Sequence, residues 1–421
     1  MKSELIYPQL FKALKFLFYL IPISLIIGNA ALNITAVLIV INLIFISFLD
    51  KNFLIKYKNI FFLFLFFFTL LLVNSFFSSD NIKSVISSLG IVRYFFLMIA
   101  LLYCIEHDNF FLKKFSKFLF FLLLFVAFDT YVQYFFGKDI FGIENSSSHG
   151  QRLNGPFGDE YIVGSYLSKL FFFSLMYFFI NDKKFIFIFI YLIFILVVIF
   201  LTKERMASLM ILFTSFIFLM YTSKISFKHR ISSLLIFLII FSSLIYFNKS
   251  IKDHLILRSL QQIGLVQNYD EKNNEKRFFK DSQWGAHFIT AQQIFLDNPI
   301  LGSGVKTFRS ECGKDKYSVI DSASKNIRCN THPHNLYLEF LSETGLILFL
   351  PFLLFNLFIF FKLTQKIFRC VDCNLTLITL CSFIMLFFPL QTTGSFFSSW
   401  NGFFYWFIYA LVAYELRSVK S

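Results

Sequence analysis

The sequence predicts an all-α protein that crosses a membrane about twelve times. Three observations carry this prediction. Hydrophobic residues make up 57% of the 421 residues, and only 15% of the residues are charged, whereas soluble domains carry about 25% charged residues. Apolar segments also recur along the chain, and many reach the roughly 17–25 residues that a membrane-spanning helix requires.

The expected spans are separated by short loops, with one long polar segment between the ninth and the tenth. They lie near residues 14–28, 30–49, 60–77, 89–105, 118–136, 161–180, 185–201, 206–221, 231–248, 336–361, 375–391 and 400–416. We therefore divide the chain into nine spans over 1–248, a large loop over 249–335 and three spans over 336–421.

The distribution of lysine and arginine predicts the orientation in the membrane. Every second short loop is basic, beginning with the segment before the first span and ending with the segment after the last. Because cytoplasmic loops carry the excess of basic residues, both termini are expected in the cytoplasm and the 249–335 loop in the periplasm. This topology also explains the net charge of +14. No basic helix or aromatic-interleaved basic patch indicates a nucleic-acid partner.

The large loop is expected to fold into a small helical cap. Residues 281–297 place Trp284, Phe288, Ala291 and Phe295 on one helical stripe. Asn298-Pro299 then ends the helix, and a Gly-Ser-Gly turn follows. A loop of this length with its own structure is often functional.

Four cysteines lie in loops. Cys312 and Cys329 are the cysteines of the large loop, and an oxidising compartment permits a disulfide between them. Two unrelated thiols are the alternative. Cys370 and Cys373 form C-x-x-C, but a zinc site would need a second ligand pair nearby.

Two histidines stand where the large loop enters the tenth span. His332 and His334 flank Pro333, which favours an extended or turned backbone before it. Asn335 can cap the following helix, with Glu339 in its first turn. A histidine with a pKa near neutrality can take a proton from an attacking hydroxyl. For His334 the alternative is a structural role at the helix start. For His287 the alternative is a structural role as a buried side chain.

Several cations are expected on the same side of the membrane. Arg205 opens a helix, where its charge opposes the helix dipole. A bound anion would resolve that conflict, and snorkelling to lipid phosphate is the alternative. Arginine grips phosphate with two hydrogen bonds, so a diphosphate substrate suits this set. The other basic candidates on this side are Arg152, Lys203, Arg277, Lys306 and Arg309.

Metal and cofactor motifs are missing from the sequence. It contains no D-x-D, P-loop, Rossmann fingerprint or G-x-S-x-G. The adjacent carboxylates Asp159 and Glu160 point apart in an extended loop. We therefore expect neither a metal site nor a cofactor.

The motifs together resemble those of the O-antigen ligase and O-antigen polymerase superfamily of bacterial inner-membrane proteins. The family's H-N-x-x-L-E-x-L-x-E-x-G motif is matched by His334–Gly345. Its glycine turn after a D-N-P helix end resembles Asp297–Phe308, and its arginine at the outer start of a span resembles Leu201–Arg205. Arg152–Gly158 is also similar to a family segment. One departure is that Trp284 and His287 lie where many members have an arginine and a tryptophan.

The resemblance implies a metal-independent glycosyltransferase in the bacterial inner membrane, active on the periplasmic face. The donor would be a glycan on undecaprenyl diphosphate, and the acceptor lipid A-core or another glycan. His334 would be the base, with His332 in support. Arg205 and a loop arginine would bind the diphosphate; Arg309 is assigned to that place, with Arg277 as the competitor and Arg152 as a further contact.

Three functions remain to be distinguished. A ligase transfers the glycan to lipid A-core, and a polymerase transfers it to another carrier-linked repeat; closer likeness to ligases favours the first. A transporter of the same lipid is a third possibility. Against it, no internal repeat is visible and the polar residues gather on one face rather than at the midplane.

Overall fold

The computed structural model describes residues 2–145, 152–262, 279–370 and 373–417. Within these ranges the chain is helical, with one isolated β-bridge between Lys138 and Glu144. Each of the twelve predicted spans corresponds to a helix. These are α1 (Lys2–Ile27), α2 (Asn29–Leu49), α3 (Phe53–Phe76), α4 (Asn81–His107), α5 (Phe111–Phe136), α6 (Val163–Ile180), α7 (Phe185–Leu201), α8 (Arg205–Tyr221), α9 (Phe227–Phe247), α14 (Leu336–Arg369), α15 (Asn374–Phe387) and α16 (Ser399–Arg417).

The helices have the length and composition of an all-α polytopic membrane protein. Among the described residues, α1 to α4, α6, α9 and α14 are long and apolar enough to cross a membrane, and α7, α8 and α15 are shorter apolar helices. The sequence placed the end of the eleventh span at residue 391, but α15 ends at Phe387. Proline at 389 disfavours helical backbone at Phe388, which is extended.

Helices α4, α6 and α16 form the centre of the molecule. α16 packs against α4, while α6 packs against α5 and α15. The side chains of Tyr94, Tyr103 and Tyr166 are completely or almost completely buried there. In contrast, α9 keeps most of its side chains exposed, as expected for a helix with a lipid-facing surface.

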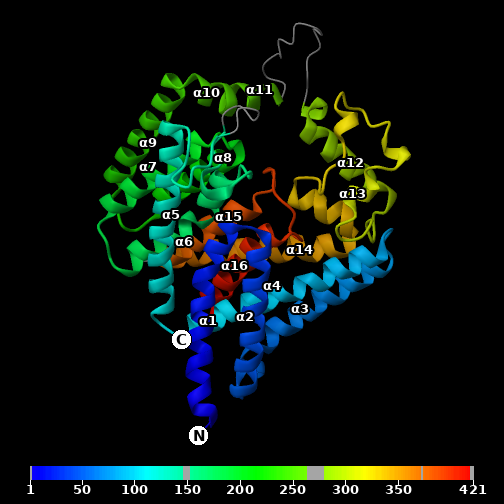
Figure 1. Ribbon diagram of the computed structural model, residues 1–421, viewed down its shortest axis with the longest axis horizontal. Coiled ribbons are helices and arrows are strands. Elements are labelled where there is room, and N and C mark those ends of the chain that lie inside the picture. Colours follow the sequence, from blue (N-terminus) through cyan, green and yellow to red (C-terminus); the bar gives the residue numbers. More distant parts are fainter. Residues whose placement is uncertain (1, 146–151, 263–278, 371–372, 418–421) are drawn as a thin grey trace.

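The long loop forms a cap at one end of the molecule. It contains α10 (Lys249–Ile251), η3 (Lys252–Leu257), α11 (Arg258–Gln262), η4 (Phe279–Asp281), α12 (Gln283–Asp297), α13 (Phe308–Glu311), η5 (Asp315–Tyr317) and η6 (Lys325–Ile327). In Figure 1 the helices α10 to α13 lie at the top, and the N-terminus lies at the bottom.

The predicted cap helix over 281–297 is present as α12. Ala291 from its apolar stripe and Ile294 beside the stripe are buried with Phe308, Cys312 and Tyr317. The cap therefore has a small apolar core of its own, against which Leu338 of α14 packs.

Candidate active site

Asn335 begins α14 and fixes the backbone on both sides of it. Its side-chain oxygen accepts hydrogen bonds from the N–H groups of Tyr337 and Leu338, both at 3.0 Å. Its amide nitrogen donates to the carbonyls of Pro389 and Gln391. The predicted N-cap is thus present, and it also binds the loop between α15 and α16.

Glu339 and Glu343, the two carboxylates of the motif, hold two different loops. The Glu339 carboxylate accepts from the N–H of Phe396, in the α15–α16 loop, at 2.9 Å. The Glu343 carboxylate accepts from the N–H groups of Lys306 and Phe308 at 2.8 and 3.1 Å. Both side chains are buried. They are therefore used to position backbone next to the helix start.

Gly345 breaks α14 and makes room for the glycine turn of the cap. Its φ of +60° favours glycine, and a Cβ on it would lie 2.6 Å from the nitrogen of Gly302. The turn replaces the hydrogen bonds that the helix loses. The replacing bonds run from Ser303 N–H to Ser342, from Gly304 N–H to Glu343, from Leu346 N–H to Pro299 and from Ile347 N–H to Ile300.

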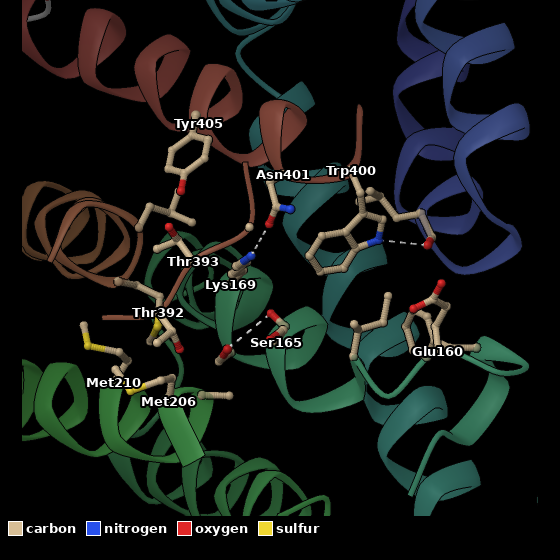
Figure 2. Close-up of a pocket in the computed structure, with 18 of the residues that line it drawn as sticks. Glu160, Ser165, Lys169, Met206, Met210, Thr392, Thr393, Trp400, Asn401 and Tyr405 are labelled. Carbon is tan, nitrogen blue, oxygen red and sulfur yellow. Dashed lines mark hydrogen bonds between the residues drawn. The ribbon is translucent and has the colours of Figure 1, made fainter. Parts of the chain in front are cut away.

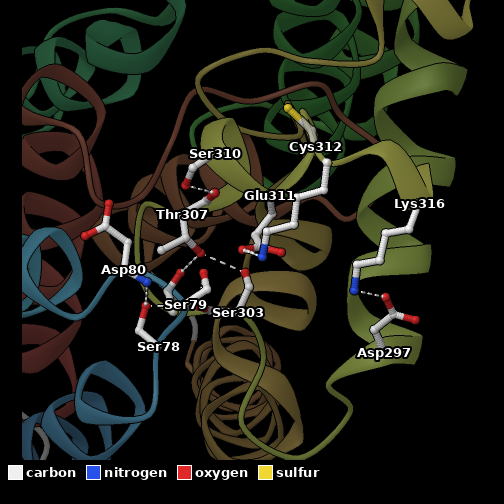
Figure 3. A network of polar contacts seen from close by, with 12 residues as sticks. Ser78, Ser79, Asp80, Asp297, Ser303, Thr307, Ser310, Glu311, Cys312 and Lys316 are labelled. Atoms are coloured by element: carbon white, nitrogen blue, oxygen red, sulfur yellow. Dashed lines mark hydrogen bonds and ion pairs between the residues drawn. The ribbon is translucent and has the colours of Figure 1, made fainter. Parts of the chain in front are cut away.

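The glycine turn is also held by the α3–α4 connection (Figure 3). The hydroxyls of Ser78 and Ser79 donate to the carbonyl of Ser303, at 3.0 and 3.1 Å. Ser78 lies so close to Gly304 that a Cβ on this glycine would overlap its side chain. The D-N-P and glycine-turn motif is thus enclosed between two membrane helices and α14.

Three histidines gather above the start of α14. The ring of His334 lies 4.2 Å from that of His332 and 5.3 Å from that of His287, measured between centroids. Trp284 contacts His334 edge-on at 4.8 Å. His334 has a φ of +59°, a conformation uncommon for a residue with a side chain. The Thr393 N–H fixes this conformation by donating to the His334 carbonyl at 2.8 Å.

The three imidazoles differ in their hydrogen bonds. Nε2 of His332 donates to the Thr393 carbonyl at 3.1 Å, and its Nδ1 lies 2.9 Å from the Thr331 hydroxyl. Nε2 of His287 donates to the carbonyl of Ile327 at 3.0 Å. By contrast, Nε2 of His334 is buried and has no hydrogen-bond partner among the described residues. This nitrogen is free to accept a proton.

Burial keeps the histidines neutral. It is the main cause that lowers the pKa of His334 to about 3, and the neighbouring His332 and His287 add to it. Burial likewise lowers the pKa of His332 to about 4, against the effect of its bond to Thr393. Neutral imidazole is the form that can act as a base. A bound anion beside His334 would raise its pKa again, because negative charge favours the imidazolium.

A disulfide joins Cys312 to Cys329, with 5.3 Å between their Cα atoms. It ties α13 to the segment that leads into His332. The guanidinium of Arg328 supports the same link by donating to the Cys312 carbonyl at 2.9 Å. A second disulfide joins Cys370 to Cys373 after α14.

Cations from three parts of the chain converge at the start of α8. Arg152 and Arg258 are the charges that act on Arg205. Burial, followed by the charges of these three arginines and Lys203, lowers the pKa of His254 to about 4. The cluster is therefore strongly positive, as a site for a diphosphate requires.

The turn between α7 and α8 positions Arg205 beside the other cations of this cluster. The Glu204 carboxylate turns away and accepts hydrogen bonds from the N–H groups of Gly164 and Ser165. Lys203 takes a φ of +59° to make the turn. Arg152 donates to the carbonyl of Tyr161, and its Nε is buried without a partner among the described residues.

A cavity of about 480 Å³ lies next to the first turns of α8 and to the α15–α16 loop that binds the histidines. It is lined by Met206 and Met210 of α8 and by Glu160. It is also lined by Thr393, whose backbone binds His332 and His334. Figure 2 shows Thr392, Thr393 and Tyr405 on one side and Glu160 on the other.

The structure brings together some of the residues singled out from the sequence and separates others. Arg152 and Arg205 are neighbours, as are His332 and His334. Arg309 is exposed on α13 and is not among the charges acting on Arg205. Its place beside Arg205 is taken by Arg258. Arg277 lies outside the described residues.

Sequence reasoning missed three residues of this region. His254 and Arg258 follow the ninth span with i, i+4 spacing, which puts them on one helical face, and this spacing could have revealed them. Lys169 carries a charge within a predicted span, which usually marks a functional site. Lys306 was noted in the sequence, and its charge acts on His332. No group of three metal-ligating side chains occurs within the described ranges.

Comparison with known families agrees with the motifs. Residues 190–353 match the family model described as O-antigen ligase. The matched range includes Arg205 and Arg258 of the cationic cluster, the cap, and the start of α14 with its histidines, whereas Arg152 lies outside it. No curated protein matches the chain. With its apolar helices, the match indicates a multi-pass protein of the bacterial inner membrane, with activity of the ligase or polymerase type. An O-antigen ligase domain over residues 190–353 thus supports the resemblance to the O-antigen ligase superfamily that the motifs predicted.

Proposed function

We propose that this protein is an O-antigen ligase-type glycosyltransferase, which moves a polysaccharide from undecaprenyl diphosphate to lipid A-core. The observation that carries the proposal is the unpartnered Nε2 of the neutral His334, near a cavity whose lining includes Thr393 and also Met206, the residue after Arg205. A base for the acceptor and cations for the leaving group are the two requirements of such a transfer.

In the proposed reaction, the acceptor hydroxyl attacks the anomeric carbon of the donor sugar. A new glycosidic C–O bond forms, and the bond between that carbon and the diphosphate oxygen breaks. The hydroxyl proton passes to Nε2 of His334. The diphosphate leaves on its lipid with the bonding electrons, and Arg205, Arg152 and Arg258 stabilise its growing negative charge.

The remaining residues of the motif position these groups. His332 is held through both ring nitrogens, so it supports the loop instead of accepting the proton. Lys306 adds a positive charge on the histidine side. No step of this proposal requires a metal ion. The basic loops support a reaction on the periplasmic side, since they predict a cytoplasmic N-terminus and the cap lies at the opposite end of the molecule.

The test is transfer by His334→Ala in a strain that lacks the wild-type protein. Loss of a general base lowers the rate by about 10²–10⁴-fold, so polysaccharide attached to lipid A-core should disappear from gels. His229→Asn is the control, since His229 is exposed at the start of α9. Full-length attached polysaccharide in His334→Ala would overturn the catalytic role.

Deletion of the protein distinguishes the two transferases. Carrier-linked polymer that accumulates while lipid A-core stays bare supports the ligase. Single repeats on lipid A-core would identify a polymerase.

A further inference from the structure

Lys169 places a positive charge inside the cavity. It lies in the second turn of α6, about 9 Å from the start of that helix at 1.5 Å per residue. Its ammonium donates to the side-chain oxygen of Asn401 at 2.8 Å and sits over the rings of Trp400 and Phe404. Charges at such depth are costly and usually functional.

The ammonium keeps hydrogen-bonding capacity for a ligand. An ammonium has three N–H donors, and among the described residues Asn401 is its one hydrogen-bond acceptor. No ion pair joins Lys169 to a carboxylate in that part of the chain. The nearby Glu204 is engaged by Gly164 and Ser165. The charge is thus solvated by an amide and two rings, and it faces the cavity (Figure 2).

The partners of Lys169 are themselves fixed in place. The Asn401 amide donates to the Ser398 hydroxyl at 3.3 Å, which orients its oxygen toward Lys169. Gly394 makes room for Asn401, because a Cβ there would overlap the amide. The Trp400 indole donates to the carbonyl of Leu25 at 3.2 Å. The site is therefore built before any ligand enters.

The rest of the cavity suits a sugar. Its volume of about 480 Å³ is within the range of about 300–1,000 Å³ found for small-molecule sites. Polar groups that can bind hydroxyls line it together with apolar side chains. They are Glu160, Ser165, Gln391, Thr392 and Thr393.

We propose that this cavity binds an acidic sugar unit of the acceptor, with Lys169 binding its phosphate or carboxylate group. The proposal rests on the transferase function above. The acceptor is chosen over the donor because the donor diphosphate already has the Arg205 cluster. The cavity wall at Thr393 also holds both His332 and His334, toward which an acceptor hydroxyl must point.

Binding can be tested without turnover on the full-length protein in detergent. Trp400 lines the cavity and is one of three tryptophans, so its fluorescence should change as ligand enters. Glucose 6-phosphate and glucuronate serve as acidic probes, and glucose as the neutral one. We expect a saturable change with the acidic probes and an affinity at least tenfold weaker for glucose.

Two substitutions of Lys169 remove the charge in different ways. Lys169→Met keeps the apolar stem, and Lys169→Gln keeps a hydrogen-bond donor, so one of them can replace the other if folding fails. Both should weaken acidic probes about tenfold or more and leave glucose unchanged. Lys117→Met, on the exposed face of α5, is the matched control. Acidic probes that bind Lys169→Met and Lys169→Gln as tightly as wild type would overturn the proposal.

Transfer kinetics then identify the substrate that carries the acid. In Lys169→Gln the KM for the acceptor should rise about tenfold, and removal of acceptor phosphates or carboxylates should have the same effect on wild type. A rise in the donor KM alone overturns the assignment to the acceptor. His334→Ala should lose transfer but keep probe binding, so failure of the base and failure of this site are separate results.

Discussion

Two groups of charges, one at each end of the molecule, have opposite kinds of neighbours. At the end of the molecule where the N-terminus lies, cations are paired with carboxylates from other helices. These pairs are Lys15 with Asp108, Lys56 and Arg417 with Glu106, and Lys366 with Glu415. At the other end, Arg152, Arg205 and Arg258 lie beside one another, and Lys169 faces a cavity.

The difference separates charges that are paired between helices from like charges that lie close together. An ion pair between helices satisfies the charges of both partners without a ligand. A group of like charges raises the energy of the empty site and lowers that of the anion-bound one. The backbone differs in degree, because Lys203, Lys306 and His334 have positive φ in the second region and Asp182 has it in the first; such residues often lie at functional sites.

The largest effect is expected from a substitution in the second region. Arg205→Ala should lower transfer about 10²–10³-fold, since removal of one preorganised group that stabilises a leaving charge has this magnitude. Arg417→Ala, which removes an arginine from the paired region, should leave turnover at the wild-type level. Turnover of purified protein with donor and acceptor lipids is the measurement. Wild-type turnover in Arg205→Ala would remove this arginine from the donor site.

The next effect concerns the glycine turn that joins the cap to α14. Gly304→Ala should destabilise the protein by about 2–4 kcal/mol, because overpacking costs about 1–3 kcal/mol and the positive φ about 1 kcal/mol more. Gly142→Ala has a similar positive φ but open space around it, so it should show only the smaller part. Thermal unfolding measures both.

Removal of Ser78 provides the check on this steric explanation. The double variant Gly304→Ala with Ser78→Gly should recover part of the loss. A double variant as unstable as Gly304→Ala alone contradicts the overlap with Ser78.

The disulfide of the cap should contribute a comparable amount. Cys312→Ser with Cys329→Ser opens a link across 17 residues, for which about 2–4 kcal/mol is typical. Cys370→Ser with Cys373→Ser opens a link across three residues and should cost less, because shorter loops restrict the unfolded chain less. Unfolding midpoints in denaturant compare the two. Equal shifts would contradict the loop-length explanation.

A further effect is a pH dependence of stability. The pKa values of His332 and His334, about 4 and about 3, lie below the ordinary 6.5. Between about pH 4 and pH 6.5 the unfolded chain therefore binds protons that the folded protein does not. Stability should fall as the pH falls through this window.

Thermal unfolding at pH 7.5 and pH 5 measures this dependence. The double variant His332→Asn with His334→Asn should lose less stability on acidification than wild type. His229→Asn is the control at the paired end and should behave as wild type. An unchanged slope in the double variant would show that other groups cause the dependence.

The sequence by itself determined the helices and marked the motifs of the candidate site. Apolar length and helix caps act locally, so the twelve helices, the Asn335 cap and α12 could be predicted. The motifs at Arg205, at the glycine turn and at the H-N pair could also be recognised in the sequence. Each motif meets a local requirement of the backbone, such as the positive φ of Gly345.

Only the tertiary structure decided which side chains meet. Arg258 lies beside Arg205 where the sequence suggested Arg309, and Lys169 meets Asn401 across 232 positions of the chain. Such meetings depend on how helices pack and how the cap folds back over them. The charge, length and local geometry of a segment contain no information about its distant neighbour. The physical reason is that helix formation is local, whereas the site is made by packing.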